Sequence, residues 1–244
     1  IGGVEIESHT TLPVKKGLSS SASICVLTAR TFNCLYGLKI SPRGEMDLAY
    51  KGENLTNSRC GRMDQACAYQ SPVLMTFDED GMDLKEMKVG KEMNMVIVDL
   101  KKGKNTKKIL TDLNRCYPFA QNAMDRGVQK YLGQINKEIV FAAREAIASG
   151  DIERVGNLMK EAQKKFDKHL GSACSEFGAP KLHYLLGHRK IQQFIYGGKG
   201  VGSQGDGSAQ FVCRGKEEQQ EMIKILEKDK KLYVKCYELD IKKT

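Results

Sequence analysis

The sequence is short of the residues that mark several common classes of protein. It has no tryptophan, 5 prolines and 7% aromatic residues in 244 residues. Its 8 cysteines form no CxxC pair, which argues against a zinc site and, in a chain of this size, against a disulfide framework. Scattered thiols are typical of a reducing compartment, so we expect a cytoplasmic protein. No run approaches the roughly 18 apolar residues of a membrane helix, so we expect no membrane partner.

Catalytic and metal-binding signatures based on histidine are also missing. His9, His169, His183 and His188 share no metal-ligand spacing, and no hydrolase-type serine elbow accompanies them. The nucleotide-binding loop GxxxxGK[ST] is absent as well. The sequence therefore points away from zinc enzymes, Ser/His/Asp hydrolases and proteins with that loop.

Positive charge, in contrast, is in excess. The chain has 39 Lys and Arg against 30 Asp and Glu, a formal net charge of +9, and a pI near 9.0. Much of the excess lies in KKGKNTKK at 101–108 and near the C-terminus. A solvated face, attraction to a polyphosphate and binding of nucleic acid all fit this pattern. Because no aromatic residues alternate with the lysines as a base-stacking surface requires, we expect no nucleic-acid partner.

The apolar pattern divides the chain near residues 112–120 into a mixed first part and a helix-rich second part. The predicted elements of the first part are a strand at 3–9, a helix from Ser19 to Gly37, a helix at 42–55 begun by Pro42, a turn and helix at 59–69, and strands at 73–78 and 93–100. The last strand is nearly all apolar and is expected at the centre of a sheet. The predicted elements of the second part are helices at 121–148, 151–169 and 180–195, a glycine-rich turn with a short strand after it, a helix at 216–228 and a strand at 232–239.

The first candidate site is PVKKGLSSSAS, Pro13–Ser23, where a loop enters a helix. A helix N-terminus leaves backbone N–H groups unpaired and carries a partial positive charge. Gly17 lets the backbone approach a ligand closely, so the segment has the features of an anion-binding cradle. The alternative is an ordinary serine N-cap.

Two further segments carry candidate residues. Asp64, in CGRMDQACA, is either an N-cap or a base for a substrate hydroxyl, and Glu53 is either an exposed helix residue or a ligand of Mg²⁺. GGKGVGSQGDGS at 197–208 has six glycines in twelve positions. Such density permits positive φ and close approach to phosphate, or it marks a flexible loop; the strand predicted directly after it favours a site.

Together and in this order, the three segments resemble the motifs of the GHMP kinases, named for galactokinase, homoserine kinase, mevalonate kinase and phosphomevalonate kinase. PVKKGLSSSA is similar to the family's P-x-x-x-G-L-G-S-S-A and departs from it at Ser19, where a glycine is usual. CGRMDQ is similar to the galactokinase segment around the catalytic aspartate. VIVDLKKGKNTKKIL resembles a strand with a Lys/Thr-bearing loop, and GGKGVGSQGDGS resembles the third motif, with Gln204 and Asp206 as insertion-like departures.

The resemblance implies roles for particular residues. Ser20 and the backbone of 17–22 would hold the triphosphate of ATP, Ser21 and Glu53 would bind Mg²⁺, and Asp64 would be catalytic. The glycine-rich segment would line the phosphate and substrate side of a cleft between the two halves. The residues assigned to the nucleotide in this way are Gly17, Leu18, Ser19, Ser20, Ser21, Ala22, Gly200, Gly202 and Gly205.

The resemblance also implies an α+β, two-domain GHMP kinase fold. Residues 1–115 would form an α/β ATP-binding domain that lacks its first segment, and residues 116–244 a helix-rich domain with a small antiparallel sheet. The implied activity is transfer of the ATP γ-phosphoryl group to a hydroxyl of a small molecule, a sugar or sugar derivative. A mevalonate-type kinase, an enzyme like mevalonate diphosphate decarboxylase and a non-catalytic ligand-binding sensor stay open as alternatives, and an oligomer is compatible with all of them.

Overall fold

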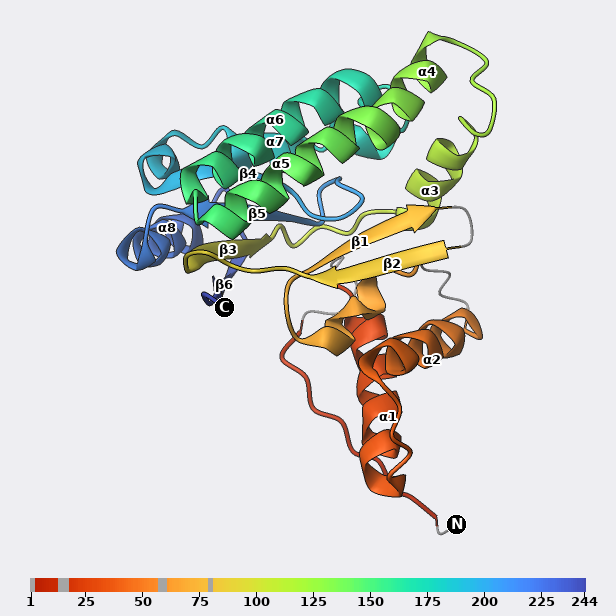
Figure 1. The fold of residues 1–244 in the computed structure, drawn as a ribbon. Helices are drawn as coiled ribbons and strands as arrows, with labels where there is room; N and C mark the ends of the chain where they lie inside the picture. The colour runs from red at the N-terminus through yellow and green to blue at the C-terminus, as the bar shows by residue number, and fades with distance from the viewer. Residues whose placement is uncertain (1–2, 13–17, 57–60, 79–80) are drawn as a thin grey trace. The chain divides into compact units, whose positions relative to one another are not determined.

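The computed structural model describes residues 3–12, 18–56, 61–78 and 81–244 (Figure 1). The chain forms two compact units, Ile1–Ala68 and Tyr69–Thr244. No helix in the described part of the chain is long and apolar enough to cross a membrane. The first unit contains α1 (Ser20–Tyr36), α2 (Pro42–Asn54) and most of the 3-10 helix η1 (Asp64–Tyr69). The second contains β1 (Val73–Asp78), β2 (Gly81–Glu86), β3 (Met93–Asp99), α3 (Thr106–Asn114), α4 (Ala123–Lys130), the π-helix η2 (Tyr131–Ile135), α5 (Asn136–Ser149), α6 (Ile152–Leu170), η3 (Ser175–Gly178), α7 (Pro180–Leu186), η4 (Arg189–Phe194), β4 (Ile195–Gly200), β5 (Ser208–Cys213), α8 (Lys216–Lys228) and β6 (Lys235–Ile241).

Helices α1 and α2 begin and end at residues that favour helix termini. Gly37 caps the C-terminus of α1 with a left-handed backbone, φ 59°, a conformation that glycine adopts at little cost. Pro42 lies in the first turn of α2, and the Ser41 side chain accepts a hydrogen bond from the N–H of Gly44 at 3.2 Å. Both predicted helices are therefore confirmed.

A buried carboxylate fastens α2 to α1. Glu45, which is 4% exposed, accepts hydrogen bonds from Arg30 at 2.7 Å and from Asn33 at 2.8 Å. Burial opposes the charged form, but these bonds and the Arg30 charge hold the pKa of Glu45 below its usual value. Arg30 also donates to the carbonyl of Ala68, so the same side chain ties η1 to α1.

The second unit holds a β1–β2 hairpin and a four-stranded antiparallel sheet with strand order β4-β5-β3-β6. Strand β3 therefore lies between two strands from the end of the chain. Val98 of β3 pairs with Ala209 of β5 on one side and with Cys236 of β6 on the other. The central position predicted from the apolar sequence of β3 is confirmed.

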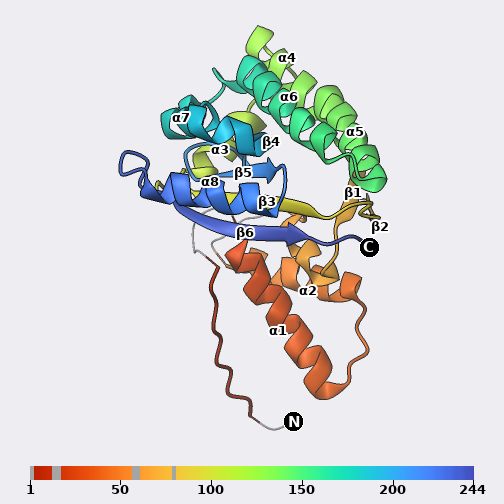
Figure 2. The same ribbon diagram turned by 90° about the vertical axis from the view of Figure 1, so that its left-hand side faces the viewer.

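This sheet is covered by helices on both faces, and the alternation of side chains along β3 shows how. Met93 and Met95 join a core formed with α4, α5 and α6, whereas Val96 and Val98 join a second core formed with α7, η4 and α8. Figure 2 shows α4, α5 and α6 together on one side of the sheet. Because both faces of β3 are buried, the strand is apolar at nearly every position.

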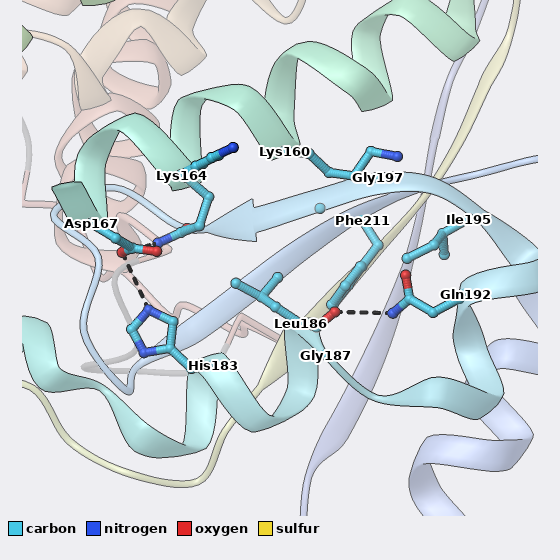
Figure 3. Close-up of a pocket in the computed structure, with 12 residues that line it drawn as sticks. Lys160, Lys164, Asp167, His183, Leu186, Gly187, Gln192, Ile195, Gly197 and Phe211 are labelled. Atoms are coloured by element: carbon cyan, nitrogen blue, oxygen red, sulfur yellow. Dashed lines mark hydrogen bonds and ion pairs between the residues drawn. The ribbon is translucent and has the colours of Figure 1, made fainter.

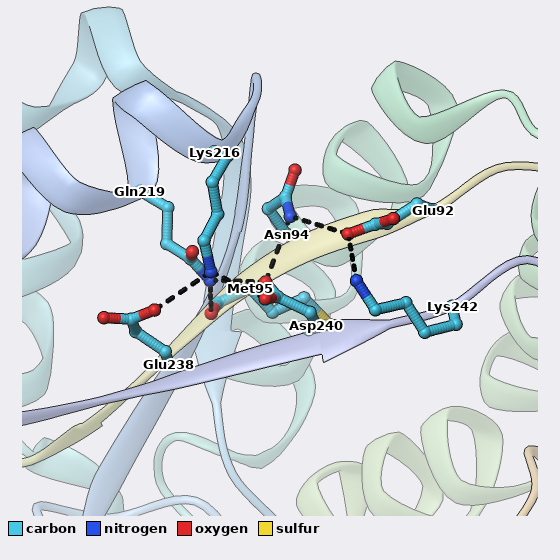
Figure 4. Close-up of polar contacts among 8 residues, drawn as sticks. All are labelled: Glu92, Asn94, Met95, Lys216, Gln219, Glu238, Asp240 and Lys242. Atoms are coloured by element: carbon cyan, nitrogen blue, oxygen red, sulfur yellow. Dashed lines mark hydrogen bonds and ion pairs between the residues drawn. The ribbon is translucent and has the colours of Figure 1, made fainter.

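A polar cluster on the outer strand fastens α8 to the sheet (Figure 4). Asp240 of β6 accepts hydrogen bonds from Lys216 at 2.6 Å, Asn94 at 3.0 Å and Gln219 at 3.1 Å. These bonds, the Lys216 bond above all, lower the pKa of Asp240 to about 2. Gln219 is fully buried and also donates to the carbonyl of Met95 at 2.7 Å.

Several predicted elements were wrong in type or extent. Residues 3–12 form neither strand nor helix, and the expected third helix, η1, is a 3-10 helix. The expected helix at 180–195 is divided into α7 and η4, while α3 occupies part of a segment expected to be a loop. The first four residues of the glycine-rich segment, 197–200, belong to the strand β4, which pairs with β5, and do not form a turn.

The compact units divide between Ala68 and Tyr69, whereas the sequence predicts a domain boundary between residues 115 and 116. Residues 93–99, from the predicted first domain, pair with β5 and β6 from the predicted second domain. The boundary at 115/116, as a division between family domains, stays a prediction.

Candidate active site

The N-terminus of α1 coincides with the predicted anion-binding segment. Ser19 is the N-cap, with φ 55° and ψ 35° in the left-handed region, and its side chain makes no capping hydrogen bond. The N–H of Ser23 bonds to the Ser19 carbonyl at 3.0 Å, and the N–H groups before it lie in the turn that has no acceptor within a helix. No acidic residue in this turn offsets the partial positive charge. The segment therefore offers N–H donors and a favourable field to an anion.

The other residues predicted for this segment differ in their surroundings. Leu18 and Ser20 are half-buried, Ser21 is exposed, and Ala22 is fully buried beneath the first turn. Gly17 lies outside the described residues. Ser21 is thus the residue of this turn that is most open to solvent.

The Ser21 hydroxyl meets a buried carboxylate from α2. It donates a hydrogen bond of 2.6 Å to Oε1 of Glu53, and Gln65 Nε2 donates one of 2.8 Å to Oε2. Glu53 is 3% exposed and Gln65 is fully buried, so Glu53 is not the exposed helix residue of the alternative interpretation. Two residues predicted for a metal site, 32 positions apart in sequence, are therefore in direct contact.

Asp64 is the first residue of η1. It is half-buried and directly precedes Gln65, whose side chain reaches Glu53. Burial raises the pKa of the Cys67 thiol, a hydrogen bond with Ser23 opposes that rise, and the Asp64 charge adds to it. The Cys67 side chain thus contacts Ser23 of α1 and is close enough to Asp64 for the charge of that residue to act on it.

The oxygen atoms of Ser21 and Glu53 are the kind of ligand that Mg²⁺ prefers. Among the described residues, no group of three or more His, Cys, Asp or Glu could hold a metal ion. Mg²⁺ usually keeps several waters and needs one or two protein carboxylates together with substrate phosphates. A hydroxyl and a carboxylate 2.6 Å apart fit such a partial ligand set, provided that phosphate oxygens complete it.

In the second unit, the glycine-rich segment needs glycine for two different reasons. Gly202 and Gly205 have positive φ, 56° and 77°, which other residues rarely adopt. Gly200 ends β4, and a Cβ there would lie 2.0 Å from the Gln204 side chain. Its N–H donates to Gln163 of α6 at 2.9 Å. The backbone at Gly200 is therefore held between the side chain of Gln204 and that of Gln163.

Charged residues hold this turn in place. Asp206, 4% exposed, accepts the N–H groups of Lys181 and Leu182 at 3.0 and 2.9 Å and pairs with Lys102 at 2.7 Å. Lys104 donates to the carbonyl of Val201 at 3.1 Å. Part of the lysine cluster at 101–108 thus packs on the glycine-rich turn.

Two residues important in these sites were missed by sequence reasoning. Gln65 was not singled out because an amide beside a candidate acid carries no sequence signal of its own. Asp206 was treated as an insertion-like departure, although it anchors the start of α7. A carboxylate inside a glycine-rich segment is a signal that could have suggested such an anchor.

Comparison with known proteins gives a family match at the N-terminal end. Residues 2–71 match the family described as GHMP kinases N terminal domain. A galactokinase of Thermococcus kodakarensis is 26% identical over 204 residues, covering 72% of this chain and 57% of the relative. A galactokinase of Pyrococcus furiosus is 25% identical over 237 residues, covering 86% and 64%. The chain thus spans less than two thirds of the length of either relative.

Among solved structures, the mevalonate kinase of L. major in complex with R-mevalonate superposes with a TM-score of 0.72. The sequence identity is 20%, and the match covers 93% of this chain and 66% of the other. This likeness concerns the fold alone, and it confirms the α+β architecture that the sequence predicts.

Proposed function

We propose that the chain is a GHMP-type kinase that transfers the γ-phosphoryl group of ATP to a hydroxyl of a sugar or sugar derivative. The match of residues 2–71 to the GHMP kinases N terminal domain supports this proposal. The observation that carries the proposal is the contact of Ser21 with Glu53 at the start of α1, together with the bond to Glu53 from Gln65, the residue after Asp64. Family resemblance assigns these three residues to one phosphoryl-transfer site.

The start of α1 would hold the triphosphate. Its first-turn N–H groups and the Ser20 hydroxyl are donors, and the helix dipole, about half an elementary charge, favours phosphate. In phosphoryl transfer, positioning and neutralisation of charge supply most of the catalysis. Gly200, Gly202 and Gly205 are proposed to contribute backbone groups to phosphate or substrate.

Ser21 and Glu53 would hold Mg²⁺, which neutralises charge on the phosphates when bound. Glu53 is kept in position by Gln65, so its carboxylate is already oriented without the ion. Glu53 is buried, whereas Ser21 is exposed. A metal ion would therefore reach the pair from the side of Ser21.

Asp64 would accept or orient the proton of the acceptor hydroxyl. Its position at the start of η1, one residue before the side chain that reaches Glu53, supports this role. A sugar is favoured over mevalonate because both curated relatives described above are galactokinases and because CGRMDQ resembles the galactokinase segment.

The test is an ADP-release assay across sugars, sugar phosphates and mevalonate. Asp64→Asn should keep ATP binding and lose most turnover, whereas Asp47→Asn, which changes a half-exposed carboxylate paired with Arg43, should behave as wild type. Equal turnover of Asp64→Asn and wild type on the best acceptor would remove Asp64 from catalysis. Absence of ADP release with every acceptor, despite ligand binding, would favour the sensor alternative.

The metal assignment has its own variant. Ser21→Ala should raise the Mg²⁺ concentration needed for half-maximal activity, whereas Thr28→Ala, which removes another α1 hydroxyl that bonds to the Ile24 carbonyl, should not. An unchanged Mg²⁺ requirement in Ser21→Ala would exclude Ser21 from the metal site.

A further inference from the structure

A cavity of about 390 Å³ opens on the second unit, bordered by α6, α7 and the edge strand β4 (Figure 3). Phe211 beneath it is fully buried, and its rim carries the exposed Lys160 and Lys164 beside Asp167. Such a rim offers a ligand little more than surface charge. In the first unit, by contrast, buried polar contacts fasten the 3-10 helix η1 to both α1 and α2.

The place of η1 depends on what it contacts. The helix is only 6 residues long, and its first residue is Asp64, the proposed catalytic residue. A 3-10 helix has poorer hydrogen-bond geometry than an α-helix, so contacts with neighbouring elements largely decide where such a short piece lies. Whatever holds η1 therefore also holds Asp64.

The N-terminal end of η1 is tied to α2. Gln65 is fully buried, and its Nε2 donates a hydrogen bond of 2.8 Å to Oε2 of Glu53. Because Gln65 directly follows Asp64, this bond fixes the start of η1 against a proposed metal ligand.

The C-terminal part of η1 is tied to α1 by Arg30. Nη2 of Arg30 donates to the carbonyl of Ala68, which is 2% exposed, and to Oε2 of Glu45 at 2.7 Å. Nε of the same guanidinium donates to Oε2 of Glu45 at 2.9 Å. The buried carboxylate thus holds the planar guanidinium in the orientation from which it reaches η1.

Arg30 is engaged with the protein instead of facing a ligand. Its charge is taken up by Glu45, which is 4% exposed and also accepts a hydrogen bond from Asn33 at 2.8 Å. The remaining contact of the guanidinium is the carbonyl of Ala68. Any effect of Arg30 on phosphoryl transfer must therefore pass through η1.

We infer that Arg30 is a positioning residue of the phosphoryl-transfer site. It fixes the C-terminal part of η1 through the Ala68 carbonyl, while Gln65 fixes the other end, and together they set Asp64 relative to the start of α1. This inference rests on the proposed function, in which Asp64 acts on the acceptor hydroxyl. A displacement of about 1 Å can cost roughly a hundredfold in rate, so a loose η1 should lower turnover strongly.

The test is Arg30→Lys, assayed by ADP release on the best acceptor. The lysine side chain ends one bond closer to the backbone and has no planar fork, so its ammonium can pair with Glu45 but loses the carbonyl of Ala68. We expect kcat to fall at least tenfold and KM for ATP to stay within twofold of wild type. The affinity for Mn²⁺ with a non-hydrolysable ATP analogue, measured by electron paramagnetic resonance, should also stay within twofold, because Ser21 and Glu53 keep their contact.

Two control variants separate positioning from stability. Arg43→Lys makes the same substitution at a part-exposed arginine of α2 that pairs with Asp47, and its kcat should stay within twofold of wild type. Asn33→Ala removes hydrogen bonds to Glu45 and Ile40, which both lie outside η1. It should lower the unfolding temperature and leave kcat within threefold, with all assays run well below the unfolding temperature of the least stable variant.

Hydrogen exchange tests the hold on η1 without turnover. In Arg30→Lys the amides of Cys67 and Ala68 should exchange at least fivefold faster than in wild type, and in Asn33→Ala within twofold. Unchanged exchange in Arg30→Lys would overturn the inference whether or not the protein is active. So would a wild-type kcat in Arg30→Lys, or a loss of kcat in Asn33→Ala as large as that in Arg30→Lys. Absence of ADP release by wild type with every acceptor would instead overturn the proposed function, and the positioning role with it, even where exchange is faster.

Discussion

Ser19 occupies a conformation that suits glycine better than serine. With φ 55° and ψ 35°, its Cβ is close to the following carbonyl, which costs about 1–2 kcal/mol for a residue other than glycine. The Ser19 side chain makes no capping hydrogen bond that would offset this cost. Glycine in the same place loses about 0.5–1 kcal/mol more conformational entropy on folding. Taken from the middle of each range, the difference predicts that Ser19→Gly stabilises the protein by about 0.5–1 kcal/mol.

The change is measurable by thermal and urea unfolding followed by far-ultraviolet circular dichroism, which suits a chain without tryptophan. For a chain of this length, the expected gain raises the unfolding temperature by about 1–4 °C. Ser19→Ala is the matched control, because it removes the hydroxyl but keeps the Cβ. It should stay within about 0.5 kcal/mol of wild type.

Two results would refute the reasoning about Ser19. If Ser19→Gly unfolds at the wild-type temperature or below it, the left-handed backbone is not a source of instability. If Ser19→Ala is destabilised by much more than its expected limit, the hydroxyl makes a stabilising contact, and the balance between Cβ strain and entropy does not describe this position.

Three further predictions concern the second unit. Because its pKa is lowered in the folded protein, ionised Asp240 contributes to the free energy of unfolding; this contribution is fully present above the usual pKa of 3.8 and is lost as the pH falls through about 2. Asp240→Asn should therefore lower the free energy of unfolding by about 1–2 kcal/mol at neutral pH. Asp206→Ala should cost about 2–3 kcal/mol because the buried N–H of Leu182 and the part-buried N–H of Lys181 lose their acceptor, whereas Lys102→Met should cost under about 1 kcal/mol. Gly197→Ala should cost more than about 3 kcal/mol, because its Cβ would lie 1.9 Å from a carbonyl oxygen of α6, whereas Gly133→Ala has open space and should be neutral or slightly stabilising.

Denaturant unfolding at several pH values tests all three. A wild type and an Asp240→Asn variant that lose stability in parallel between pH 4 and pH 2 would contradict the role of Asp240. Equal costs for Asp206→Ala and Lys102→Met would mean that the ion pair, and not the backbone bonds, holds the turn. Normal stability of Gly197→Ala would show that α6 and β4 can move apart at little cost.

The ends of α1 and α2 could be predicted from the sequence because the residues that begin and end a helix act within one turn of it. Gly37 ends one helix by its own backbone preference, and Pro42 and Ser41 begin the next. The alternation at 3–9 failed because a strand needs a hydrogen-bonded partner, which alternation alone does not supply, and no strand pairing involves these residues. Gly197 and Gly198 were expected in a turn, whereas the pairing of β4 with β5 and the close approach of α6 decide their conformation.

The candidate site was predicted only as far as motif resemblance reached. Ser21 and Glu53 were assigned to one metal site by resemblance, and the structure brings their side chains into contact. Gln65 became visible only in three dimensions, because its role depends on the fold bringing η1 beside α2. Asp206 was missed for the same reason: its partners lie on α7 and in the loop after β3, far from it in sequence.

The arrangement of β3 has a consequence for synthesis of the protein. During translation Val98 leaves the ribosome long before its partners Ala209 and Cys236 exist, so the strand has both edges unpaired for much of that time. Nascent chains halted before residue 208 should therefore be prone to aggregate and to bind chaperones. Chaperone binding should end when β5 and β6 have been synthesised and have paired with β3.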